Sequence, residues 1–170
     1  MSWTAGMINP FVVKGDTIRS EREYIVKASE TFKKGELIRI TNDGEIALAL
    51  TTTSAVGGLH GIAAANATDY LTDGDYAGQT IPVLLFTTDT VIGIQLMAAK
   101  DQDDVLIGES YATAVASNKW TMTVTPTNGI VQVVGKPAND QWFDTNVASD
   151  EDRAPIYVKV IQSVLDGRSD

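Results

Sequence analysis

Two apolar runs in the middle of the chain form a long hydrophobic stretch, Ile81–Met97. The runs are Pro82–Phe86 and Val91–Met97, and the polar residues 87–90 separate them. Both runs are short and rich in β-branched and aromatic residues, which favours strands over helices. We therefore predict a β-hairpin at the centre of a mainly β domain.

The same alternation of short apolar runs and turn residues recurs along most of the chain. Residues 42–45, Asn-Asp-Gly-Glu, are typical of a tight hairpin turn between two such runs. Further strands are expected at Tyr24–Ala28, Leu37–Thr41, Ile46–Leu50, Val105–Tyr111, Trp120–Thr125, Ile130–Val134 and Ile156–Leu165. Many short strands separated by turns indicate a small antiparallel β-barrel or β-sandwich, which we place at residues 24–165 with a C-terminal tail at 166–170.

Residues 1–23 lack this pattern, because glycine, asparagine and proline interrupt isolated apolar residues and the second half is dense in charge. Two interpretations stay open. The segment is either a frayed terminus or an extended N-terminal arm that docks on a neighbouring chain. We predict the arm. Its anchors in the partner would be the large apolar side chains Trp3, Met7, Ile8 and Phe11.

Three further aromatic residues bear on partner binding. Trp142 and Phe143 lie together in a long acidic loop, residues 136–154. Such a pair either packs against the domain itself, which we favour, or contacts a partner. Trp120 shares one face of a predicted strand with Met122, and we expect both in the core.

The charge of the chain limits its partners. The formal net charge is −9 and the pI is about 4.5. Binding a phosphate backbone requires clustered lysine and arginine, so we expect no nucleic-acid partner. The uncharged segment Ile46–Thr68 contains too many threonine, serine, glycine and asparagine residues for a membrane span. We therefore expect a protein without a membrane partner that is made in the cytoplasm.

Residues that carry chemistry are few. His60 is the only histidine and cysteine is absent, so we expect a hydrogen-bonded structural role for His60. The glycine-rich residues 57–61 lack the Lys-Ser/Thr pair of a phosphate loop. Asp101, Asp103 and Asp104 lack the spacing of a calcium loop, which favours a solvated turn. We expect no catalytic residues, no cofactor and no metal site.

Several segments resemble the head decoration, or capsid cement, proteins of tailed phages. Glu30–Ala49, ETFKKGELIRITNDGEIALA, has the order of strand, Lys-Gly-Glu turn, strand, Asp-Gly hairpin and strand that is found near the start of such proteins. Gly61–Thr68, Val105–Pro137 and the closing strand Ile156–Leu165 are similar as well. The resemblance extends over residues 24–165 and consists of turn-and-strand patterns without a chemical signature.

This resemblance implies a β-tulip-like barrel that forms homotrimers on the outer surface of the virion. Such proteins bind the major capsid protein of an expanded bacteriophage head, bridge neighbouring subunits and stabilise the shell. This role requires a rigid body, a self-complementary interface and segments that reach a neighbour, but no active site.

Two other classes of function are alternatives. One is another virion component, either a tail or fibre module or a glycan-binding adhesin. In the adhesin, Trp120 and Trp142 would stack on sugar rings. The other is an enzyme, which we do not expect, because neither a Ser-His-Asp arrangement nor a GxSxG motif is present.

Overall fold

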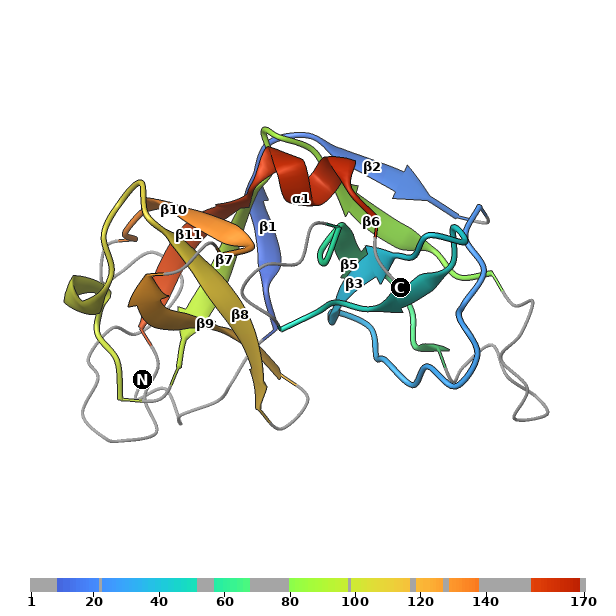
Figure 1. Ribbon diagram of the computed structural model, residues 1–170, viewed down its shortest axis with the longest axis horizontal. Coiled ribbons are helices and arrows are strands. Elements are labelled where there is room, and N and C mark those ends of the chain that lie inside the picture. Colours follow the sequence, from blue (N-terminus) through green and yellow to red (C-terminus); the bar gives the residue numbers. More distant parts are fainter. Residues whose placement is uncertain are drawn as a thin grey trace.

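The computed structural model describes residues 9–21, 23–51, 57–67, 80–97, 99–116, 119–126, 129–137 and 154–168. These residues form two β-sheets side by side, with one short helix near their junction (Figure 1). The predicted mainly β fold is therefore confirmed.

Five strands of the first sheet close into a barrel. Its neighbours follow the order β7-β11-β10-β8-β9, and β9 returns to pair in parallel with β7 through Gln95–Thr121 and Leu96–Met122. Strand β1 adds to β7 outside this ring. The strands of the first sheet are β1 (Phe11–Lys14), β7 (Val91–Leu96), β8 (Ser110–Ala116), β9 (Lys119–Pro126), β10 (Val131–Gly135) and β11 (Pro155–Val160).

The second sheet is antiparallel throughout and lies on the right in Figure 1. Its order is β2-β6-β5-β3-β4. The strands are β2 (Thr17–Ser20), β3 (Leu37–Ile40), β4 (Ile46–Leu48), β5 (Gly61–Ala63) and β6 (Val83–Phe86). Two helical segments complete the described elements, the 3-10 turn η2 (Gln102–Asp104) and the helix α1 (Gln162–Asp166).

Two clusters of buried side chains form the core, and the larger one joins the two sheets. It fills the barrel around Trp120 and Ile156 and continues to Leu37 and Phe86 of the second sheet. The smaller cluster contains Ile38 and lies on the opposite face of the second sheet. Leu37 and Ile38 belong to different clusters because successive side chains of a strand point to opposite faces. The second sheet is thus buried on both faces, one of them against the barrel.

The predicted hairpin at Ile81–Met97 is wrong, although both of its strands exist. β6 belongs to the second sheet and β7 to the barrel, so the polar residues 87–90 cross between the sheets instead of turning back. The Thr87 and Thr90 hydroxyls both donate to the carbonyl of Asp16, which lies in a second crossing between the sheets, the one from β1 to β2. The polar residues 87–90 thus form a hydrogen-bonded crossing, and the apolar runs on either side enter different sheets.

The predicted arm is also corrected over part of its length. Residues 11–14 and 17–20 form β1 and β2, which pair with β7 and β6. Their crossing at Gly15 has φ +91° and touches the other crossing, since a Cβ on Gly15 would lie 2.0 Å from the Asp89 oxygen. Charged residues interrupt the apolar residues of these short strands, so the sequence pattern does not predict them. Trp3, Met7 and Ile8 lie outside the described residues.

The predicted closing strand Ile156–Leu165 divides in two. Residues 155–160 form β11, whereas residues 162–166 form α1. Val164 of α1 is buried in the larger core cluster, and α1 lies at the junction of the two sheets (Figure 1). A helix here places Val164 and Leu165 against the core, which an extended chain leaving the sheet would not do.

Candidate functional site

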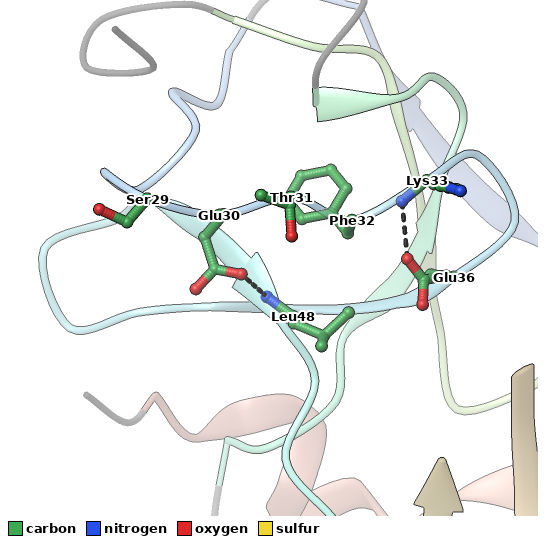
Figure 2. A pocket seen from close by; sticks show the side chains of 7 residues that line it. All are labelled: Ser29, Glu30, Thr31, Phe32, Lys33, Glu36 and Leu48. Carbon is green, nitrogen blue, oxygen red and sulfur yellow. Dashed lines mark hydrogen bonds between the residues drawn. The ribbon is translucent and has the colours of Figure 1, made fainter. Parts of the chain in front are cut away.

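The first candidate site is a hollow of about 330 Å³ beside the second sheet (Figure 2). Its floor contains the buried ring of Phe32, and two carboxylates, Glu30 and Glu36, lie at its edge. The lining residues are Ser29, Glu30, Thr31, Phe32, Lys33, Glu36 and Leu48. Two carboxylates in a hollow raise the question of acid–base chemistry.

Both carboxylates are engaged with the backbone. The Leu48 N–H donates to Glu30 Oε2 at 2.9 Å, and the Lys33 N–H donates to Glu36 Oε2 at 2.6 Å. Figure 2 shows the two side chains turned toward separate backbone groups rather than toward each other. Glu36 also closes a turn with Lys33, in which Gly35 has φ +91°. These contacts give the carboxylates a structural role.

Glu30 takes part in covering the edge of the second sheet. Strand β4 would otherwise present unpaired backbone groups along its outer side. The Ile46 N–H donates to the Ile25 oxygen, the Lys27 N–H donates to the Ile46 oxygen, and Glu30 accepts from Leu48. The Glu30–Ala49 pattern that carries the resemblance is therefore a folding motif, made of an edge cover, a turn and two strands.

His60 fastens the end of the chain to the second sheet. Its Nδ1 accepts from the Ile40 N–H at 3.0 Å, and its Nε2 lies 2.7 Å from the Gly167 oxygen. A carbonyl only accepts, so Nε2 carries the proton and the imidazole is neutral. Burial lowers the His60 pKa, and the charges of Arg168 and Arg39 lower it further, against the raising effect of the Gly167 bond. The two hydrogen bonds of His60 agree with the structural role expected from the sequence.

The second candidate site is an exposed turn of the barrel, residues 106–109, which we call the apolar turn. Leu106 and Ile107 are 61% and 62% exposed, more than any other large apolar residue among those described. The turn lies between η2 and β8, at the end of the barrel away from the second sheet (Figure 1). Adjacent apolar side chains in water mark a contact surface more often than isolated ones.

Hydrogen bonds hold the apolar turn in one conformation. The Glu109 N–H closes it on the Leu106 oxygen at 3.2 Å, and Gly108 supplies the left-handed residue at φ +93°. The Leu106 N–H donates to the hydroxyl of buried Tyr111. On the other side, the Gly108 N–H donates to the Val133 oxygen at 2.8 Å. A turn anchored on both sides loses little conformational freedom when it binds.

Four carboxylates lie in the apolar turn or shortly before it in the sequence. Asp101, Asp103, Asp104 and Glu109 are all exposed. Asp104 Oδ2 accepts from the Asp101 N–H at 2.9 Å, and Asp103 lies 3.8 Å from the Lys136 ammonium. Among the described residues, no group of three or more His, Cys, Asp or Glu side chains is placed to hold a metal ion. The apolar turn therefore belongs to a segment that combines two exposed apolar side chains with four exposed carboxylates.

Of the predicted partner-binding residues, only Phe11 is described. It lies in β1 opposite Gly93 and is half-buried. Trp3, Met7, Ile8, Trp142 and Phe143 fall outside the described residues. Trp120 is fully buried, as expected for a core residue, so it presents no face to a sugar ring.

The expected strand at Val105–Tyr111 is wrong over most of its length, and the apolar turn lies within it. Residues 105–109 instead form a turn, and β8 begins at Ser110. The pair Gly108-Glu109 was the available signal, since glycine supplies the positive φ of such turns. Three apolar residues in a row, Val105 to Ile107, concealed it.

Comparison of the chain with protein-family models, curated proteins and solved structures found no match. Within the part of the chain that the structure describes, no helix has the length and apolar character needed to cross a membrane.

Proposed function

We propose that this chain is a structural decoration protein, which binds the outer face of an expanded phage head and bridges neighbouring subunits of the major capsid protein. The observation that carries the proposal is the apolar turn. Its two large side chains are exposed, yet their backbone is fixed by bonds to Tyr111 and Val133. A rigid apolar point is suited to contact with another protein.

Other features of the described chain support the same role. The larger core cluster runs through both sheets, which suits a body that must transmit force between two neighbours. The covered edge of β4 limits unwanted strand pairing, which matters for a protein crowded on a surface. The acidic charge favours solubility under the same conditions.

We further propose that the protein acts as a homotrimer on the virion surface and that Trp3, Met7 and Ile8, three of the expected arm anchors, contact a neighbouring chain. β1, which begins at Phe11, pairs with β7 and attaches this part of the chain to the barrel. Deleting residues 2–8 while keeping β1 tests this. Loss of capsid binding without loss of the folded state supports the arm, whereas full binding by the truncated chain removes it.

The function itself is tested by shell stability. Expanded heads that lack the decoration protein are heated with and without the purified chain, and DNA release is followed with an intercalating dye. We expect the chain to raise the temperature of DNA release in a saturable manner. An unchanged release temperature at saturating protein would contradict a cementing role.

A further inference from the structure

The surroundings of the apolar turn define the kind of surface that it fits. Leu106 and Ile107 project from a segment that carries four exposed carboxylates within nine residues, 101–109. Lys136 is the cation that the described contacts place beside them, at 3.8 Å from Asp103. An apolar contact on a segment rich in negative charge pairs best with a hollow that has positive charge at its rim.

We propose that the apolar turn inserts into an apolar hollow on the shell protein whose rim carries lysine or arginine. This inference rests on the proposed function, and it names the partner surface that the function leaves open. Leu106 and Ile107 would supply the buried contact, and Asp103 and Glu109 would pair with the basic rim.

Charge also argues against a second copy of the chain as the occupant. Two copies meeting at this turn would bring eight carboxylates together, from the four on each, on molecules that each carry a net charge of −9. Like charges facing each other at a contact oppose association. The same carboxylates would speed the approach to a basic surface and make it dependent on salt.

The fixed backbone of the turn lowers the conformational-entropy cost of this insertion. Leu106 and Gly108 are tied by their N–H groups to Tyr111 and Val133, and the Gln132 side-chain amide donates to the Gly108 oxygen at 2.8 Å. The backbone of the turn therefore loses little further conformational freedom when it binds. Removing the two side chains should therefore weaken binding without unfolding the protein.

The test uses the full chain and expanded, undecorated heads in a co-sedimentation assay. The apolar variant is Leu106→Ser with Ile107→Ser, and its matched control is Ile18→Ser, which changes a residue 57% exposed on β2. We expect the apolar variant to bind about tenfold more weakly or worse, and the control to bind as wild type. Circular dichroism verifies that all three proteins are folded.

A charge variant tests the basic rim. Asp103→Asn with Glu109→Gln should weaken binding and reduce its dependence on salt between about 50 mM and about 500 mM NaCl. Glu23→Gln with Asp43→Asn removes the same charge from exposed positions on the second sheet side and should change binding little. Equal effects of the two charge variants would overturn the basic rim.

The outcomes separate this inference from the proposed function. If wild type binds heads and the apolar variant binds equally well, the turn is not the contact and only the inference fails. If wild type does not bind heads at all, the function and the inference both fail. If sedimentation velocity shows that wild type self-associates and the apolar variant does not, the occupant is a second copy and the basic hollow is wrong.

Discussion

His60 shows at the scale of one residue how the chain end depends on protonation. Its neutral ring accepts from Ile40 and donates to Gly167, while burial lowers its pKa from the ordinary value of 6.5. The unfolded chain therefore binds a proton at a higher pH than the folded chain does. Stability is fully present above about pH 6.5 and is lost as the pH falls toward the lowered pKa.

We predict that wild type loses at most about 1.4 kcal/mol of unfolding free energy through this residue between pH 7.5 and pH 5.5. Because His60 is the only histidine, His60→Gln should flatten the pH dependence in this interval. Urea unfolding at the two pH values measures both proteins. Parallel pH profiles would show that His60 does not titrate as its contacts require.

Two buried hydroxyls should respond oppositely to removal. Ser20 Oγ is buried and has no hydrogen-bond partner among the described residues, whereas Thr90 Oγ1 accepts from the Thr87 N–H and donates to the Asp16 oxygen. We predict that Ser20→Ala leaves the unfolding free energy unchanged or raises it by up to about 1 kcal/mol. Thr90→Val should lower it by about 1–3 kcal/mol. A larger loss in Ser20→Ala than in Thr90→Val, by thermal or urea unfolding, would refute this assignment.

At the scale of elements, the two crossings between the sheets fix which strands pair. Gly15 has φ +91° and no room for a Cβ, which would lie 2.0 Å from the Asp89 oxygen. Gly108 has φ +93° but open space around it. Both positions therefore require a left-handed backbone conformation, but only Gly15 lies in tight contact with another segment.

We predict that Gly108→Ala costs about 1–2 kcal/mol, which is the cost of a left-handed residue. Gly15→Ala should cost clearly more, because the backbone of the other crossing must also move. Chemical denaturation of the two variants gives the comparison. Equal losses would mean that the crossings are not in tight contact.

Most strand positions and one pairing, the β3–β4 hairpin at residues 42–45, could be predicted from the sequence. The partners of the strands that are far apart in the sequence could not. The runs at residues 83–86 and 91–96 stand out because their apolar residues are continuous. They enter different sheets, and the segment between them bonds to Asp16, which is far away in the sequence and which no local pattern reveals. The apolar turn was not predicted for a related reason, since one of its hydrogen bonds is to Val133, which is also distant in the sequence.

At the scale of the whole molecule, the continuous core predicts that both sheets unfold together. Leu37 and Phe86 of the second sheet share a cluster with Trp120 and Ile156 of the barrel. Neither sheet keeps this buried surface if the other unfolds. We predict one calorimetric transition with equal calorimetric and van't Hoff enthalpies. Two separated transitions would show that the sheets are independent domains.

Co-sedimentation shows whether this acidic protein decorates an expanded phage head, as we propose. Purified chain is mixed with expanded, undecorated heads of the phage proposed to encode it, with unexpanded heads as the control. We expect saturable binding to expanded heads alone, at a fixed ratio to the major capsid protein. If the chain bound neither form, the proposed function would be wrong.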